Sequence, residues 1–312
     1  MSANILVTGG CGYLGSTIVP LLLAAGHKVT VVDNLMFGQA SLNQVCHYPN
    51  FDFVKADVRL EAEMKPLFAG ADLVIPLAAF VGAPLCDKDP IGAHSVNNEA
   101  IKMMLGLLSS EQLVLMPTTN SAYGSGDKDN FCDEMSPLNP ISKYAIDKVE
   151  IEKELMDHGN SVSFRLATVF GMSPRMRLDL LVNDFTYRAV NDGFLVLFES
   201  HFKRNYIHII DVARAFMHAI ENYSSMRGEI FNVGLSDANV SKWELCETIK
   251  KQLPKFYFAE AEVGLDPDQR NYVVSNAKIE GKGFSTVMSL DAGITELIKG
   301  YKMINNRKYG NV

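Results

Sequence analysis

The sequence is poor in the features that mark secreted, zinc-stabilised or membrane proteins. Its five cysteines are an odd number, and no two of them stand in a C-x-x-C pair, which argues against a disulfide framework and a zinc knuckle. The histidines lack metal-binding spacings such as H-E-x-x-H. No apolar run is long enough to span a bilayer, and the first residues lack the order of a secretory signal peptide. We therefore expect a cytoplasmic protein without a metal site, neither exported nor anchored to a membrane.

Positive charge is also scarce. The 312 residues include 29 Lys and Arg against 36 Asp and Glu, a formal net charge of −7. Such a chain has no electrostatic footprint for nucleic acid or for an anionic membrane surface, so an anionic ligand must be held by a few local cations. This balance favours a function on small molecules.

The sequence does contain a regular alternation of short β-branched runs with amphipathic segments of helical length. Near-continuous apolar strands separated by helices indicate βαβ units and a parallel sheet covered on both faces. We therefore predict an α/β fold, a Rossmann-type doubly wound parallel sheet with a smaller mixed α/β lobe. The predicted strands are 5–9, 29–33, 51–57, 71–79, 112–117 and 161–167.

The alternation changes after Gly171, where a second lobe is expected. No Gly-, Ser- or Pro-rich linker separates the two parts, so we expect them to share an interface. The first domain is predicted to comprise 1–170 with a returning segment at about 205–235, and the second lobe 171–204 and 236–312. The predicted elements after Gly171 are a helix near 178–191, a strand near 195–198, and helices starting at 211, after 241 and at 289.

A glycine-rich motif, VTGGCGYLG, follows the first predicted strand and opens the first helix. Glycines at this place let the backbone turn tightly and approach a pyrophosphate, whose charge then lies at the helix N-terminus. The next strand ends at Asp33, close to the spacing at which an acid binds the adenosine ribose and disfavours a 2′-phosphate. The pattern favours NAD over NADP, although a glycine-rich turn without a ligand remains an alternative for the motif alone.

A second motif, YAIDK, places Tyr144 and Lys148 four residues apart in a predicted helix, and so on one face of it. A phenol is a poor base at neutral pH, but the Lys148 cation and the positive nicotinamide ring would favour the phenolate. Lys148 could also hold the nicotinamide ribose. An isolated pair of this kind is more often only an exposed helical pair, so the interpretation depends on the glycine loop and Asp33.

With these motifs in order, the chain resembles the extended short-chain dehydrogenases/reductases of the nucleotide-sugar epimerase/dehydratase type. The similarity runs from TGGCGYLG through YAIDK, RLATVFG, RNYIHIIDVA and FNVG to the last helix. It implies NAD as the cofactor, and Thr119, Tyr144 and Lys148 as catalytic residues. A histidine frequent in the family after the fourth strand is replaced here by Pro76-Leu77, which puts the fine shape of the cofactor pocket in question. The cofactor-binding residues implied are Gly9, Gly12, Tyr13, Leu14, Gly15, Asp33, Asn34, Asp57, Val58, Leu77, Ala78, Ala79, Asn97, Tyr144 and Lys148.

The polar strand end PTTNSAYG then suggests which reaction occurs. Family members that eliminate water carry an Asp-Glu pair after the catalytic Thr, whereas this chain has Asn120 and Ser121, and neither side chain titrates usefully. We therefore expect redox chemistry on a carbinol, with Thr119 orienting the hydroxyl. The substrate-binding residues predicted are Asn120, Ser121, Arg175, Arg177, Arg204 and Arg270, because arginine forks suit diphosphate oxygens.

The most specific prediction concerns the identity of the substrate. Stretches such as PLAAFVGAPLC and SPRMRLDLLVNDFTYRA look similar to GDP-heptose 4-dehydrogenases of bacterial capsular heptose modification, which implies a nucleotide-sugar substrate, oxidation at C4, tightly held NAD and recycling by a 2-oxo acid. Two alternatives remain open: a nucleotide-sugar 4-epimerase, and a non-catalytic NAD-binding protein. The resemblance also suggests a homodimer built from the helix near 98–108 and the Tyr144 helix.

Overall fold

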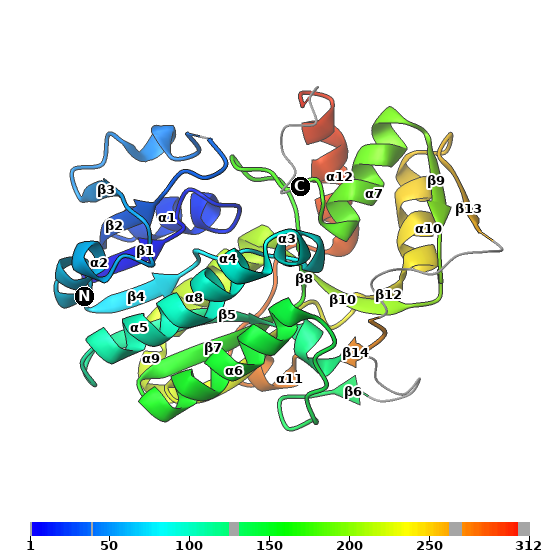
Figure 1. The fold of residues 1–312 in the computed structure, drawn as a ribbon. Coiled ribbons are helices and arrows are strands. Elements are labelled where there is room, and N and C mark those ends of the chain that lie inside the picture. Colours follow the sequence, from blue (N-terminus) through cyan, green and yellow to red (C-terminus); the bar gives the residue numbers. More distant parts are fainter. Residues whose placement is uncertain (1, 39, 125–130, 262–269, 305–312) are drawn as a thin grey trace.

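The computed structural model describes residues 2–38, 40–124, 131–261 and 270–304. Its centre is a seven-stranded sheet in the order β11-β7-β5-β4-β1-β2-β3, in which every pair is parallel (Figure 1). All six predicted strands are present, and their ends differ by at most three residues. The strands are β1 (Asn4–Thr8), β2 (Lys28–Asp33), β3 (Phe51–Lys55), β4 (Leu73–Pro76), β5 (Leu113–Thr119), β7 (Ser161–Leu166) and β11 (Glu229–Val233).

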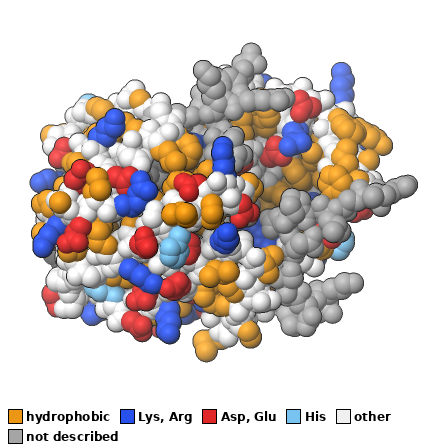
Figure 2. Space-filling model, viewed as in Figure 1, with side chains coloured by type: hydrophobic (Ala, Val, Ile, Leu, Met, Phe, Trp, Pro, Cys, Tyr) orange, Lys and Arg blue, Asp and Glu red, His pale blue; other side chains and the backbone are white. Residues whose placement is uncertain are grey.

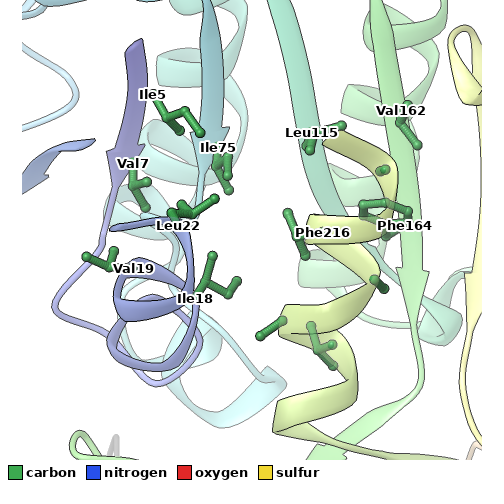
Figure 3. Packing of buried hydrophobic residues seen from close by; sticks show 14 of the residues in the cluster. Ile5, Val7, Ile18, Val19, Leu22, Ile75, Leu115, Val162, Phe164 and Phe216 are labelled. Carbon is green, nitrogen blue, oxygen red and sulfur yellow. The ribbon is translucent and has the colours of Figure 1, made fainter. Parts of the chain in front are cut away.

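Helices cover both faces of this sheet because side chains of a strand alternate between its faces. On one face, Ile5 and Val7 pack with α1 (Gly15–Ala24), and Phe164 meets Phe216 of α8 (Ile209–Glu221) edge to face at 5.0 Å (Figure 3). On the other face, Leu6 and its neighbours pack against α2 (Glu61–Ala69), α5 (Ala100–Leu107) and α6 (Lys143–His158). Each fully buried side chain of this kind stabilises the fold by about 1.5–3 kcal/mol.

The segments that connect the strands contain short helices. After β4 the chain forms α3 (Ala83–Lys88), α4 (Pro90–His94) and the π-helical turn η2 (Ser95–Glu99), which continues directly into α5. The remaining short elements of this half are η1 (Asn43–Val45), η3 (Asn120–Tyr123), α9 (Tyr223–Met226) and α11 (Ala277–Glu280).

The chain also forms three small sheets, with the strand orders β12-β10-β8, β13-β9 and β14-β6. The first two border a separate apolar cluster of the second half, and β14-β6 borders a smaller cluster of its own. Their strands are β6 (Phe131–Cys132), β8 (Thr168–Phe170), β9 (Phe194–Leu197), β10 (Lys203–His208), β12 (Asn239–Ser241), β13 (Tyr257–Glu260) and β14 (Val273–Val274). The helices are α7 (Leu181–Asn191), α10 (Lys242–Gln252), which has a Ser241/Glu244 capping box, and α12 (Leu290–Tyr301).

Six of the predicted boundaries were wrong by two or three residues, and three of them concern residues near the site or the helices beside it. β3 ends at Lys55, so Asp57 lies in the turn beyond the strand. Helix α7 begins at Leu181, because 178–180 form a turn. Helix α8 begins at Ile209, where the His208 side chain accepts a hydrogen bond from the Ile210 N–H.

The surface carries charges of both signs. Figure 2 shows Lys and Arg side chains interspersed with Asp and Glu over the face viewed. Within the described part of the chain, no helix combines the length and the apolar character needed to cross a bilayer.

Candidate active site

A cavity that is partly open to solvent lies where the strand order changes direction. From β1 the chain proceeds to β2 and β3 on one side of the sheet and returns to β4 on the other side (Figure 1). The loops after β1 and β4 therefore diverge, which is where doubly wound sheets bind ligands. The predicted cofactor residues that line the cavity are Gly9, Gly12, Asp33, Asn34, Asp57, Val58, Leu77, Ala78 and Ala79.

Two glycines of the loop after β1 are required by close backbone contacts. Gly9 has φ = +67°, and a Cβ there would lie 2.4 Å from the Ala78 nitrogen. A Cβ on Gly15 would lie 2.4 Å from the Gly10 carbonyl oxygen. The loop can thus lie against the chain after β4 and against the start of α1 only with glycine at both positions.

Tyr13 was predicted to bind cofactor, but its side chain lies outside the cavity. The ring is buried in the core of the second half, and its hydroxyl donates to the Gly171 carbonyl at 2.7 Å. The neighbouring Leu14 packs against the apolar clusters of both halves. These two side chains fasten the glycine loop to the second half, so only their backbone could face a ligand.

Asp33 lies at the end of β2 with both carboxylate oxygens aligned by backbone donors. The Cys11 N–H donates to Oδ2 at 3.0 Å and the Leu35 N–H to Oδ1 at 2.8 Å. Burial raises the pKa of Asp33, while these two donors and the nearby Arg175 act in the opposite direction. Each oxygen accepts one of these bonds and keeps a lone pair, which suits a pair of adjacent hydroxyls.

Asp57 lines the cavity but is already paired. Its carboxylate contacts the Arg59 guanidinium at 2.6 Å, and this side-chain hydrogen bond is the main reason that its pKa falls to about 2. Asn34 also hydrogen-bonds to it. The carboxylate is therefore a fixed acceptor at this wall of the cavity.

Asn97 was predicted to contact the cofactor, and the structure instead directs its amide at the backbone of Phe80. The Phe80 N–H donates to Asn97 Oδ1, and Asn97 Nδ2 donates to the Phe80 carbonyl, both at 2.9 Å. Cys86 donates its thiol to the same carbonyl at 3.4 Å. Phe80 lines the cavity, so Asn97, in the π-helical turn η2, fixes a wall of it.

Tyr144 and Lys148 lie in the first turns of α6, whose N-cap is Ser142. Lys148 Nζ is 6.0 Å from the centre of the Tyr144 ring and donates to the Pro117 carbonyl at 3.2 Å. Burial lowers the pKa of Lys148 to about 8 and raises the pKa of Tyr144 to about 12. The cations that oppose this rise at the phenol are Arg177 and Arg270. Two of the predicted substrate arginines thus lie close enough to act electrostatically on the Tyr144 phenol.

The end of β5 brings three more predicted residues together. Thr119 donates its hydroxyl to Ser121 Oγ at 3.0 Å, and Arg270 Nη1 donates to the same Ser121 oxygen. Asn120 is fully buried, and its amide nitrogen and oxygen have no hydrogen-bond partner among the described residues. A buried polar group of this kind needs an explanation, and a ligand group that satisfies it is one.

Beneath this strand end, a buried ion pair connects β5, β7 and α6. Glu152 contacts the Arg165 guanidinium at 2.6 Å and accepts hydrogen bonds from the Thr118 and Ser163 hydroxyls. Arg165 Nη1 also donates to the Tyr123 hydroxyl at 3.0 Å. Thr118 is therefore part of the framework that holds its neighbour Thr119.

The four predicted arginines lie in different places. Arg177 contacts Asp179 at 2.5 Å and reaches the Val81 carbonyl at 3.5 Å. Arg204 is buried with its guanidinium 5.9 Å from the centre of the Tyr272 ring. Arg204 and Arg270 both act electrostatically on the Tyr206 phenol, whose pKa burial raises. Arg270 thus acts on the Tyr144 phenol together with Arg177, and on the Tyr206 phenol together with Arg204.

Arg175 was predicted to bind substrate, but it lines the cofactor cavity. Its guanidinium lies 4.3 Å from the centre of the Phe37 ring and close enough to Asp33 to affect the pKa of that residue. This position arises because a loop of the second half returns to the first, which the local sequence does not indicate. Phe37 was not predicted at all, although the turn NLMFG that contains it directly follows Asp33.

The chain is similar in sequence to known proteins. A model of the NAD dependent epimerase/dehydratase family matches residues 5–234. The chain is 25% identical over 97% of its length to a putative UDP-glucose 4-epimerase of Methanocaldococcus jannaschii, of which 99% is covered. It is 25% identical over 96% of its length to UDP-glucuronic acid decarboxylase 1 of Arabidopsis thaliana, of which 70% is covered.

Solved structures extend the likeness to the fold. The UDP-glucose 4-epimerase of Thermotoga maritima, crystallised with UDP-glucose, superposes with a TM-score of 0.83 at 25% identity, covering 96% of this chain and 99% of that one. A dTDP-glucose 4,6-dehydratase of Bacillus anthracis gives the same TM-score at 20% identity, covering 99% of both chains. The predicted fold class, a Rossmann-type sheet with a smaller second part, is confirmed.

Proposed function

Because the chain belongs to the NAD dependent epimerase/dehydratase family, and is therefore an NAD-dependent enzyme, we propose that it oxidises a secondary hydroxyl of a nucleotide-diphosphate sugar. The observation that carries the proposal is the position of Arg270, which hydrogen-bonds Ser121 and also acts on the Tyr144 phenol. The polar end of β5 and the start of α6 thus face one reaction site. The relatives named as UDP-sugar enzymes support this substrate class.

The cavity fits the cofactor on its own geometry. Asp33 offers two aligned oxygens to the ribose diol, and Gly9 and Gly12 line the cavity just before the N-terminus of α1, which favours the negative pyrophosphate. NAD, when bound, supplies the hydride acceptor. The chain's own contribution is to position the substrate and to move its proton.

In the proposed reaction Thr119 orients the sugar hydroxyl and Tyr144 removes its proton. Because burial raises the pKa of Tyr144 to about 12, the phenolate depends on nearby positive charge, which Arg177 and Arg270 provide in this chain. Lys148 Nζ, fixed by the Pro117 carbonyl, is placed one helical turn from the phenol to bind the nicotinamide ribose.

On the substrate side, Asn120 and the arginines are assigned to the sugar and the diphosphate. The buried Asn120 amide is proposed to bond sugar hydroxyls, which would satisfy its two polar atoms. Arg204 and Arg270 are proposed to bind the diphosphate, and Arg177 to bind the substrate nearer Tyr144. Asn120 and Ser121 offer no acid or base for elimination of water, so the reaction should stop at the ketone.

Two outcomes are proposed for that ketone. The sequence stretches similar to GDP-heptose 4-dehydrogenases favour GDP-manno-heptose as the substrate and release of a 4-keto sugar, with reoxidation by a 2-oxo acid. The relatives named UDP-glucose 4-epimerase favour the second candidate, in which hydride returns to the other face of the ketone. In both cases we propose an NAD-binding domain of 1–170 with a returning segment at about 205–235, and a substrate lobe of 171–204 and 236–312.

The deciding experiment is mass spectrometry of products from purified protein incubated with GDP-, UDP- and dTDP-sugars, GDP-heptose included, with and without a 2-oxo acid. A product lighter by two hydrogens, formed in excess of the enzyme only with the 2-oxo acid, is the result expected of the dehydrogenase. A changed sugar of unchanged mass would establish the epimerase. No product from any sugar would contradict both and favour a non-catalytic NAD-binding protein.

A further inference from the structure

Two side chains from loops far apart in the sequence meet at the cofactor cavity. Phe37 belongs to the turn after β2, and Arg175 to the segment between β8 and α7. The Arg175 guanidinium lies 4.3 Å from the centre of the Phe37 ring, and both residues line the cavity. This is the distance of a cation–π contact. We call this pair, Phe37 and Arg175, the clasp.

The turn that carries Phe37 is fixed to Asp33. Leu35 has φ = +58°, a left-handed conformation that is unfavourable for a residue other than glycine. It is held by the bond from its N–H to Asp33 Oδ1 and by the Gly38 N–H, which donates to the Leu35 carbonyl at 2.9 Å. The Met36 N–H also donates to Asn34 Oδ1 at 3.0 Å. The ring is therefore placed relative to the acid that would bind the ribose.

The loop that carries Arg175 is fixed to the glycine loop. The Ser173 hydroxyl lies 2.8 Å from that of Ser16 and donates to the Tyr13 carbonyl at 2.9 Å. Arg175 Nη1 donates to the Met176 carbonyl at 2.7 Å. The guanidinium is thus set in place from the pyrophosphate side of the cavity, while the ring comes from the ribose side.

Exposure and charge indicate what the pair does. Phe37 is 40% exposed and Arg175 is 2% exposed, so the ring lies outside and covers the cation. Of the described residues that line the cavity, Arg175 is the one with positive charge, whereas Asp33 and Asp57 are negative. An anionic dinucleotide would be held by Arg175, and the ring of Phe37 covers the outer side of that cation.

We propose that the clasp slows release of the dinucleotide, so that the cofactor stays bound between turnovers. A dinucleotide that leaves must separate the ring from the guanidinium, which exposes both to water. The proposal rests on the NAD site and not on the identity of the sugar. It deepens the proposed function, because the epimerase and the dehydrogenase differ from each other in how long the reduced cofactor must stay bound.

The test measures cofactor release directly, without any sugar. Protein loaded with NADH is mixed with excess NAD, and the loss of NADH fluorescence is followed by stopped flow. We expect Phe37→Ala and Phe37→Leu to release NADH about 5- to 30-fold faster, which corresponds to loss of a cation–π contact of about 1–2 kcal/mol. Phe37→Tyr, which keeps the ring, should release it at the wild-type rate. The matched control is Phe53→Ala, because Phe53 of β3 is 37% exposed, close to the exposure of Phe37, and does not line the cavity; its release rate should stay within about twofold of wild type.

Either of two results would overturn the proposal. Wild-type release from Phe37→Ala would mean that the ring does not retain the dinucleotide. Wild-type release from Phe37→Leu would mean that the contact with the guanidinium is not what retains it. Failure of every sugar in the product assay would leave these release rates unaffected, so the two hypotheses are tested separately.

Discussion

At the scale of single residues, the phenol of Tyr144 is the group on which the proposed chemistry depends. Replacing Tyr144 with Phe removes the base and keeps the ring, so turnover should fall by about 10²- to 10⁴-fold while NAD still binds. Turnover is measured by the product assay, and NAD content by denaturing the protein and quantifying released dinucleotide. Tyr257→Phe, at an exposed tyrosine of β13, is the matched control. Turnover surviving in Tyr144→Phe would remove this residue from the mechanism.

Burial of the Lys148 cation beside Tyr144 is expected to lower the free energy of unfolding. Burial lowers its pKa from 10.5 to about 8, so between these pH values the unfolded chain binds more protons and the free energy of unfolding rises with pH. Below pH 8 the cost of the buried cation is fully present, at most about 3 kcal/mol. Lys148→Met should therefore be more stable than wild type at pH 7 by about 1–3 kcal/mol. This gain in the free energy of unfolding should be smaller at pH 9.5.

The measurement is urea unfolding at both pH values. Lys102→Met is the control, because Lys102 lies on the surface of α5 and its pKa is raised by Glu150. This control should show no gain at pH 7. A Lys148→Met protein that is less stable than wild type at pH 7 would mean that the hydrogen bond to Pro117 outweighs the cost of burial.

At the scale of elements, the buried pair of Glu152 and Arg165 holds α6 against β5 and β7. Removing one charge leaves the other buried without compensation, so Glu152→Gln should lower the free energy of unfolding by about 3–5 kcal/mol. The double variant Glu152→Met with Arg165→Met should recover much of this loss. Glu150→Gln, which breaks the exposed pair with Lys102, should cost at most about 1 kcal/mol.

Urea midpoints, with unchanged slopes, give these differences. A Glu152→Gln variant as stable as wild type would show that the pair does not fasten α6. A double variant no more stable than Glu152→Gln would show that the loss comes from hydrogen bonds to Thr118 and Ser163 and not from the uncompensated charge.

The elements of the sheet could be predicted from the sequence, whereas several contacts of the site could not. Strand periodicity and the glycine motif depend on local structure. The strands and the turn between β1 and α1 that they predict are present. The contacts of Arg175 and Asn97 could not be predicted, because they depend on how distant loops return to the sheet. Thr119 and Ser121 were named from a local polar pattern at the end of β5, whereas the contact of Arg270 with Ser121 comes from a segment 149 residues away.

At the scale of the whole molecule, two exposed surfaces could carry the predicted homodimer. One is the outer face of α5 and α6, where Ile146 is 49% exposed. The other is the two-stranded sheet β9 and β13, where hydrophobic side chains gather at the upper right of Figure 2 and Val196 is 41% exposed. Family resemblance favours the first surface, and apolar exposure alone does not distinguish them.

Charge introduced at each surface distinguishes them, because a buried unpaired carboxylate is costly at an interface but harmless on an exposed helix. We expect the wild-type protein to run as a dimer in size-exclusion chromatography with light scattering, Ile146→Glu as a monomer, and Val196→Glu as a dimer. The reverse pattern would place the interface on β9 and β13. A wild-type monomer at micromolar concentration would contradict the predicted homodimer, and the α5 and α6 helices would then pack only on their own sheet.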